Sequence, residues 1–149
     1  MTIFDKVSED IKQAMLAKDK VALSALRNIK KELLEAKTSK EASGELTDEI
    51  SIKVISKIVK QNKDAAVVFK EQGRTDLADE YEAQAEVSQQ YLPKQMTEEE
   101  IVATLKEIAT EVGASSIKEL GKLMGVASKR LAGKAEGRLI ADKAKEILS

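Results

Sequence analysis

The stretch TDEISIKVISKIVKQNKDAAVVFKEQG, residues 47–73, decides the class of fold. Its apolar residues return every three or four positions, at Ile50, Val54, Ile58, Ala65 and Phe69. This is the spacing of an α-helix with one apolar face. Thr47 is suited to cap the first turn, and Gly73 is suited to the left-handed residue that follows a helix C-terminus. The stretch therefore predicts one long amphipathic helix.

The segments on either side of this helix repeat the helical pattern. Before it, two helices are predicted, the first opened by Thr2 with Asp5 in a capping arrangement. Their inward residues are Phe4, Val7, Ile11 and Ala14 in the first helix and Ala22, Leu26, Ile29 and Leu33 in the second. The polar segment KTSKEASGE, residues 37–45, predicts a loop. After residue 73, Thr75 opens a fourth helix that ends before Pro93, and its inner side is expected to carry Leu77, Tyr81, Ala85 and Leu92.

A second group of helices is predicted after Pro93. Thr97 with Glu100 has capping-box spacing, and the apolar stripe that follows is Ile101, Leu105, Ile108 and Val112, with Gly113 at its end. Ser116 with Glu119 predicts another capping box, followed by short helices punctuated by glycines. A last helix is expected to carry Leu139, Ile140, Ile147 and Leu148.

No segment has the alternation of a β-strand or the turn residues of a hairpin. We therefore predict an all-α protein. Longer helices should form an N-terminal domain at residues 1–94. A small, compact helical domain should follow at residues 95–149.

Composition excludes several kinds of active site. The chain of 149 residues has no cysteine and no histidine, so it lacks thiolate nucleophiles, zinc–thiolate sites and the usual general base near neutral pH. Ser115 and Ser116 have no such base to activate them. Glu98, Glu99 and Glu100 could be drawn as metal ligands, but they equally suit a helix N-terminus, which we prefer. We predict no catalytic residue, no metal site and no cofactor.

The N-terminal residues MTIFDKVSED carry alternating charges and no apolar run, and no membrane span is visible further along. From this we predict a cytoplasmic location and no membrane partner.

The stretch GKLMGVASKRLAGKAEGRLI, residues 121–140, concentrates glycine and positive charge. It holds four of the seven glycines and five basic residues against the single acid Glu136. Although the net charge of the chain is −1, residues 96–117 carry one base and five acids, and residues 118–149 carry eight bases and four acids. In one interpretation the glycines are caps and tight packing points and the charges form a solvated face. In the other, a helix starting near Lys134 offers its free backbone N–H groups to a phosphate, with basic side chains around it.

The second interpretation predicts an RNA-binding surface. Its residues would be Lys122, Lys129, Arg130, Gly133, Lys134, Gly137 and Arg138. The four aromatic residues all precede this region, so bases could not stack within it. A partner would be held by its backbone and shape, as structured RNA can be.

The same residues resemble the stand-alone YqeY proteins of the GatB/YqeY family. The resemblance rests on three stretches. The first is LSALRNIKKELLEAK at 23–37, and the third is the stretch at 121–140. The second, at 57–101, runs from KIVKQNKDAAVVFK through GRTDLADEYEAQ to YLPKQMTEEEI. Two positions depart from the family pattern: Asn62 stands where an arginine is common, and Glu136 stands where a shorter Asp, Asn or Ser is usual.

The resemblance implies more than composition does. The C-terminal part is similar to the tail domain of the B subunit of the tRNA-dependent amidotransferase, which converts Glu-tRNA(Gln) or Asp-tRNA(Asn) to the amide. In that family catalysis lies in other domains, while the helical and tail domains recognise the tRNA. The implied function is a tRNA-binding accessory without catalysis of its own. The family-level label would be a carbon–nitrogen ligase with glutamine as amido donor. Implied partners are tRNA or other structured RNA, amidotransferase subunits or an aminoacyl-tRNA synthetase.

An alternative from a different class is a helical protein-interaction adaptor that does not bind RNA. Helical modules with exposed apolar grooves dock partner helices. The acidic segment from Glu98 to Glu111 could face a basic partner in such a complex.

Overall fold

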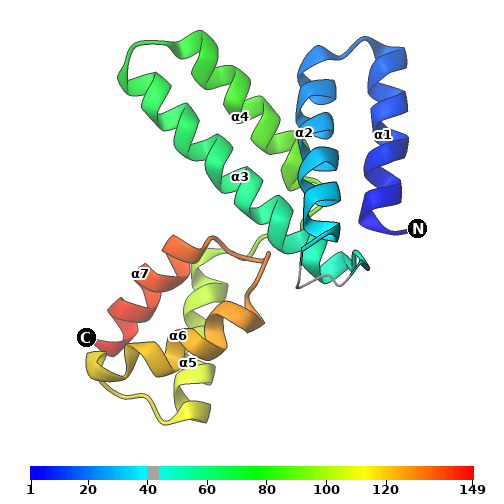
Figure 1. Ribbon diagram of the computed structural model, residues 1–149. Helices are drawn as coiled ribbons and strands as arrows, with labels where there is room; N and C mark the ends of the chain where they lie inside the picture. The colour runs from blue at the N-terminus through cyan, green and yellow to red at the C-terminus, as the bar shows by residue number, and fades with distance from the viewer. Residues whose placement is uncertain (40–43) are drawn as a thin grey trace. The chain divides into compact units, whose positions relative to one another are not determined.

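The computed structural model describes residues 1–39 and 44–149, and in those ranges it contains seven α-helices and no strand (Figure 1). The all-α prediction is confirmed. The helices are α1 (Ile3–Ala17), α2 (Lys20–Lys37), α3 (Asp48–Glu71), α4 (Thr75–Gln89), α5 (Glu98–Val112), α6 (Leu120–Arg130) and α7 (Gly137–Leu148), with a 3-10 turn, η1 (Ile117–Glu119), before α6. The chain divides into two compact units, residues 1–92 and residues 93–149. The loop expected at 37–45 falls partly on residues 40–43, which lie outside the described residues.

The first unit consists of α1 to α4, in which consecutive helices form antiparallel pairs, α1 with α2 and α3 with α4 (Figure 1). Side-chain caps open three of these helices: Thr2 in a capping box, Asp19 and Thr47. Most of the predicted inward residues of α1 and α2 lie in the core or pack against it. The buried core of this unit is Val7, Ala14, Leu26, Ile29, Leu33, Ile55, Ile58, Val59, Ala85 and Tyr91.

The buried face of α3 lies about one residue away from the predicted one. The buried residues are Ser51, Ile55, Ile58, Val59, Asn62 and Ala66, whereas Val54 and Phe69 are only partly buried. The reason is that α3 contacts α1, α2 and α4 and therefore buries a broad arc. Apolar residues also lie at both edges of that arc, so the sequence alone could not show which of them are fully buried. Phe69 instead stacks on Tyr81 of α4, with ring centroids 5.5 Å apart.

The fourth helix ends earlier than predicted. We expected Pro93 to stop α4, but the helix ends at Gln89 and a turn carries the chain through residues 90 and 91. Tyr91 is buried in the core of the first unit, with 9% of its surface exposed. The end of α4 is therefore determined by the packing of Tyr91 in the turn as well as by Pro93.

The second unit consists of α5, η1, α6 and α7. Its buried core comprises Ile101, Leu105, Ile108, Ala109, Ala114, Leu123, Ala127, Leu131, Ile140, Ala144 and Leu148. The capping box at Thr97 and Glu100 is present, and Gly113 ends α5 in the left-handed conformation with φ 71°. Both predictions are confirmed.

Two sequence predictions for this unit are wrong. Ser116 makes no side-chain cap bond, because a 3-10 turn follows it and no α-helical first turn presents amides at the right spacing. The helix expected near Lys134 begins at Gly137 instead, because residues 131–134 form a turn, residue 135 a bend, and Glu136 is an extended N-cap.

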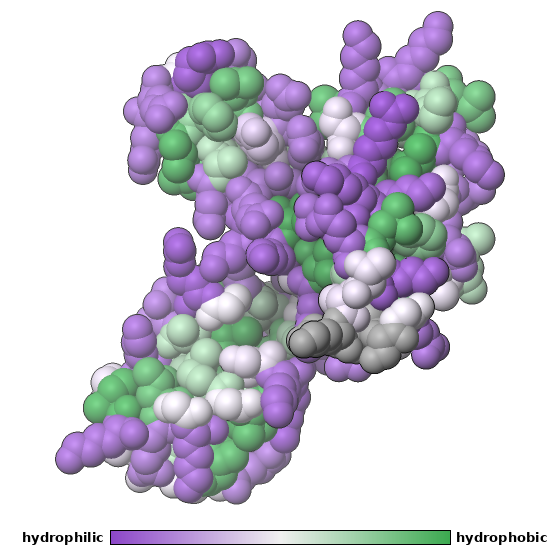
Figure 2. All heavy atoms as spheres, viewed as in Figure 1, coloured by the Kyte–Doolittle hydropathy of each residue, from purple (hydrophilic) through white to green (hydrophobic). Residues whose placement is uncertain are grey.

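The surface of both units is mostly hydrophilic on the face shown in Figure 2, with hydrophobic residues scattered among charged ones. In the part of the chain that the structure describes, no helix combines the length and the apolar character needed to cross a bilayer.

Candidate RNA-binding surface

The seven predicted RNA-binding residues fall on three consecutive segments of the second unit. Lys122, Lys129 and Arg130 lie on α6, Gly133 and Lys134 lie in the turn that follows, and Gly137 and Arg138 begin α7. The five basic side chains are all exposed. Lys122 and Lys129 are seven residues apart and so share one face of α6.

The turn between α6 and α7 is fixed by the segment that enters the unit. The backbone amide of Met96 donates to the carbonyl of Lys134 at 2.9 Å, and the side-chain amide of Gln95 donates to the carbonyl of Gly133 at 2.8 Å. Gly133 has φ 76°, a left-handed conformation that glycine adopts without strain. Sequence reasoning missed the role of Gln95 and Met96, because nothing in their spacing links them to residues 38 positions away.

Arg130 is already engaged within the protein. Its guanidinium forms a bidentate pair with the carboxylate of Glu111 on α5, at 2.8 Å and 3.3 Å. The hydrogen bond from Arg130, and then its charge, lower the pKa of Glu111, and the same contacts raise the pKa of Arg130. A phosphate would have to compete with Glu111 for this side chain, so Arg130 is a weaker candidate than its neighbours.

The other four candidate cations have no ion-pair partner among the residues that the structure describes. Lys143 of α7 pairs with Glu98 and Glu146, and Arg130 pairs with Glu111. Among residues 1–39 and 44–149, no acidic group forms an ion pair with Lys122, Lys129, Lys134 or Arg138. Two acids of α5 thus pair with two cations of the second unit. The positive charges of Lys122, Lys129, Lys134 and Arg138 remain without an ion-pair partner in the described chain.

The glycines of this region do not serve close packing inside the protein. Apart from the adjoining residues and the backbone of its own helix, a Cβ atom built on Gly121, Gly125 or Gly137 would meet nothing within 4 Å, so the interpretation of these three as tight packing points is wrong. The first two lie inside α6 and do not end a helix. Gly125 is one turn from both Lys122 and Lys129, so bare helix backbone is exposed between the two lysines.

The first turn of α7 has no side-chain cap. Glu136 occupies the N-cap position but accepts no hydrogen bond from the turn, and the turn contains no acidic residue. The helices α1, α2, α3 and α5 all have side-chain caps. The first amides of α7 therefore face solvent between Lys134 and Arg138.

In the described residues, no group of three or more acidic side chains is placed to hold a metal ion. Within the same part of the chain, Glu98 and Glu99 remain in the first turn of α5, and Glu100 makes the capping box. Glu98 pairs with Lys143 and Glu100 bonds to Thr97, so these two carboxylates have partners within the protein.

Comparison with known proteins identifies the family. The family described as "Yqey-like protein" matches residues 4–148. The chain belongs to this family. Among the relatives of this Yqey-like protein are three named "Altered inheritance of mitochondria protein 41, mitochondrial".

The first relative, from Pyrenophora tritici-repentis (strain Pt-1C-BFP), is 33% identical over 141 residues, which is 93% of the chain and 69% of the relative. The second, from Clavispora lusitaniae (strain ATCC 42720), is 30% identical over 115 residues, covering 76% of the chain and 66% of the relative. The third, from Lachancea thermotolerans (strain ATCC 56472 / CBS 6340 / NRRL Y-8284), is 31% identical over 115 residues, covering 74% and 59%. The Yqey-like chain thus spans about three fifths to two thirds of the length of these relatives.

The names of these relatives overturn the predicted cytoplasmic location. All three are named as mitochondrial proteins. The prediction was wrong because it relied on the lack of an apolar run, which argues against a secretory signal alone. Mitochondrial targeting segments are amphipathic and rich in arginine and serine, so the absence of an apolar run does not bear on them.

Proposed function

We propose that this Yqey-like protein binds structured RNA, with tRNA as the first candidate, through the basic surface of its second unit. The observation that carries the proposal is the set of four exposed cations without acidic partners in the described chain: Lys122, Lys129, Lys134 and Arg138. Lysine and arginine side chains that lack internal partners are the groups that neutralise phosphates.

The bare face of α6 supports the same proposal. A glycine inside a helix destabilises it by about 1 kcal/mol relative to alanine. The packing of α6 gives no reason for Gly121 and Gly125, since a Cβ atom at either position would stand in open space. An external partner that approaches the backbone closely between Lys122 and Lys129 supplies such a reason for Gly125, and contact that extends to the start of α6 would include Gly121.

We also propose that the protein acts as an accessory in tRNA-dependent amidation and performs no chemical step itself. The support is the resemblance, drawn from sequence, of the C-terminal part of YqeY proteins to the amidotransferase tail domain, together with the absence of cysteine and histidine. Amidotransferase subunits or an aminoacyl-tRNA synthetase would then be its protein partners. Glutamine-dependent amide formation by the purified chain alone would contradict this role.

Binding of bulk tRNA across a salt series tests the RNA proposal. The triple variant Lys122→Gln, Lys129→Gln, Lys134→Gln should bind at least about tenfold more weakly, and its salt dependence should be shallower because fewer counterions are released. The matched control is the triple variant Lys12→Gln, Lys31→Gln, Lys70→Gln, which removes the same charge from exposed positions of the first unit. Its affinity for tRNA should change by less than roughly threefold, since only long-range electrostatic attraction is reduced.

Two results would overturn the proposal. One is a folded wild-type protein that does not bind tRNA at low salt. The other is equal weakening by both triple variants, which would mean that net charge alone attracts the RNA. The first result would make the adaptor without RNA binding the better explanation. The second would remove the basic surface of the second unit as a specific RNA site.

A further inference from the structure

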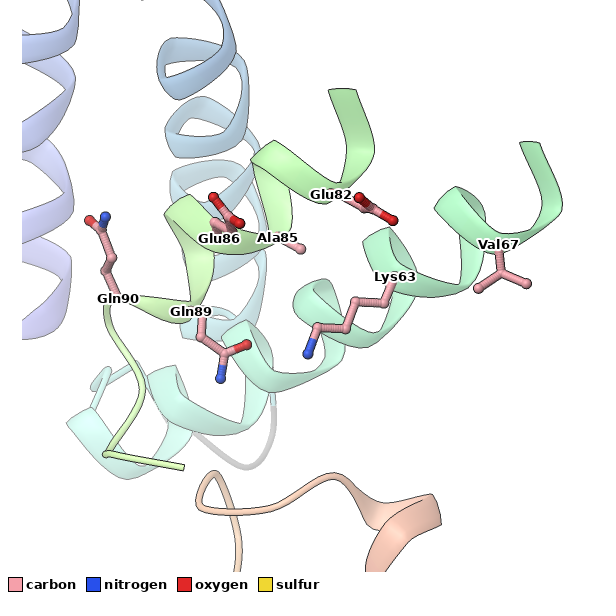
Figure 3. Close-up of a pocket in the computed structure, with 7 residues that line it drawn as sticks. All are labelled: Lys63, Val67, Glu82, Ala85, Glu86, Gln89 and Gln90. Carbon is pink, nitrogen blue, oxygen red and sulfur yellow. The ribbon is translucent and has the colours of Figure 1, made fainter. Parts of the chain in front are cut away.

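A groove lies between α3 and α4 of the first unit, remote in sequence from the basic surface (Figure 3). Its volume is about 650 Å³. Two facing rows of side chains line it, Lys63 and Val67 from α3 and Glu82, Ala85, Glu86 and Gln89 from α4. In Figure 3 the side chains of Lys63 and Gln89 extend toward one another across the space between the helices.

The groove has two apolar lining residues, and of these only Val67 is open to solvent. Ala85 is buried, with 2% of its surface exposed, and it belongs to the core of the first unit. Val67, which lines the groove from α3, is 56% exposed, and this is high for a large aliphatic side chain. An apolar side chain entering from outside would cover Val67 and remove its surface from water.

The acidic side of the groove has no internal counter-charge. Glu82 and Glu86 lie one turn apart on α4, a spacing at which like charges repel. No residue that the structure describes forms an ion pair with either carboxylate or with Lys63. The whole of α4 contains five acids and no base, and one of these acids, Asp76, is paired with Arg74. The α4 side of the groove therefore presents two carboxylates without ion-pair partners, opposite the single cation Lys63 on α3.

The dimensions of the groove favour a polypeptide segment as its occupant. From Glu82 to Gln89 the helix rises about 10 Å, which is two turns of a docked helix. Small-molecule sites enclose most of their ligand, whereas the charged side chains on both rims of this groove are exposed. We propose that the groove docks a basic amphipathic helix of a partner protein. One apolar side chain of that helix would cover Val67, and lysines or arginines four residues apart would lie beside Glu82 and Glu86 on the α4 side, opposite Lys63.

The test uses the full chain, labelled with ¹⁵N, and a defined probe. The probe is an alanine-based helical peptide with a leucine stripe flanked by lysines four residues apart, and its counterpart has glutamates in place of the lysines. The basic peptide should shift the amide resonances of Val67, Ala85 and Gln89, and the acidic one should not. The variant Glu82→Gln, Glu86→Gln should bind the basic peptide about fivefold more weakly, the effect expected from two exposed ion pairs.

A matched variant separates this groove from the general acidity of α4. Asp79→Asn, Glu80→Gln removes the same charge from exposed positions of the same helix that do not line the groove, and it should weaken binding less than about twofold. Equal weakening by both variants, shifts that map elsewhere, or no binding of the basic peptide would overturn the proposal. Saturable shifts of the same three residues by free L-lysine would also overturn it, since they would indicate a small-molecule site.

This proposal does not depend on RNA binding. The Glu82→Gln, Glu86→Gln variant leaves every residue of the basic surface unchanged, so its affinity for tRNA should not fall. Loss of tRNA binding by the triple lysine variant of the second unit should likewise leave peptide binding intact.

Discussion

The hydroxyl of Tyr91 donates a hydrogen bond to the carboxylate of Asp10 and so joins the turn after α4 to α1. The side chain is buried, and the ammonium group of Lys6 lies 5.9 Å from the centre of its ring. Burial is the main cause that raises the pKa of Tyr91, and the hydrogen bond to Asp10 and the charge of Asp10 raise it further. The phenol therefore remains a proton donor at neutral pH, and the chain is held in place two residues before Pro93.

Replacing Tyr91 by phenylalanine should destabilise the first unit by about 1 to 2 kcal/mol, because a hydrogen bond to a charged group is lost while the ring is kept. Urea unfolding followed by circular dichroism measures this. The control is Tyr81→Phe, which removes a hydroxyl that makes no hydrogen bond to any described residue and keeps the stacking on Phe69. Equal unfolding midpoints for the two variants would show that the bond to Asp10 contributes nothing.

The pair of Arg130 and Glu111 should give the second unit a defined acid dependence. The folded pKa of Glu111 is lowered, so the stabilisation is present above its ordinary value of 4.5 and is lost as pH falls through the lowered value. The variant Glu111→Gln should therefore unfold at a lower temperature than wild type at pH 7, and the two should converge in acid. Thermal unfolding between pH 3 and 8 tests this, roughly the range in which carboxylates titrate.

The matched control for that series is Glu107→Gln, which removes the same charge from α5 but breaks no ion pair with a described residue. The charge of Glu107 raises the pKa of Arg130 less than the hydrogen bond and charge of Glu111 do. The difference between this variant and wild type should stay small across the whole pH range. A gap between wild type and Glu111→Gln that persists at pH 3 would argue that the residue acts through packing and not through its charge.

Local sequence signals predicted the helices well, and signals that depend on neighbouring helices did not. Thr2, Thr97 and Gly113 were correctly predicted at helix ends, since each acts on amides or carbonyls a few residues away. The buried face of α3 was misplaced because three other helices decide which of its apolar residues are covered. Ser116 failed as a cap because the turn after it is 3-10 and not α-helical.

The candidate site shows the same division. Counting charges along the sequence located a basic region correctly, but it could not show that Glu111 of α5 lies against Arg130 of α6. Nor could spacing alone decide the role of the glycines. Gly121 and Gly125 have the four-residue spacing typical of close helix packing, and the structure places them on an open face. Which face of a helix is covered is a property of the tertiary structure.

Alanine at Gly121 and Gly125 should stabilise the protein while it weakens RNA binding. Each position is helical and has room for a methyl group, so each substitution should add about 0.5 to 1 kcal/mol of stability. If RNA approaches the bare backbone between the lysines, the double variant should bind tRNA several-fold more weakly despite its higher stability. Denaturant unfolding and tRNA titration of the same preparations test both parts.

Gly113→Ala is the informative contrast for that experiment. Gly113 has a positive φ of 71°, so alanine there should destabilise the protein by about 1 kcal/mol or more. It lies outside the proposed RNA surface and should leave tRNA affinity unchanged while the protein is folded. Unaltered tRNA binding by the Gly121→Ala, Gly125→Ala variant would separate the glycines from the RNA site and leave the lysines as the candidates.

Replacing Glu136 by aspartate should cap α7. Glu136 occupies the N-cap with φ −67° and ψ 135°, a conformation suited to capping, but its side chain makes no bond to the first turn. Aspartate keeps the charge and has the length that reaches those amides, so the variant should gain about 1 kcal/mol of stability. Glu136→Gln, which has the same length as glutamate and caps poorly, should change stability little. If the aspartate variant unfolds at the same denaturant concentration as wild type, the first amides of α7 already have partners in solution, and the departure from the shorter residue usual in the family has no local energetic effect.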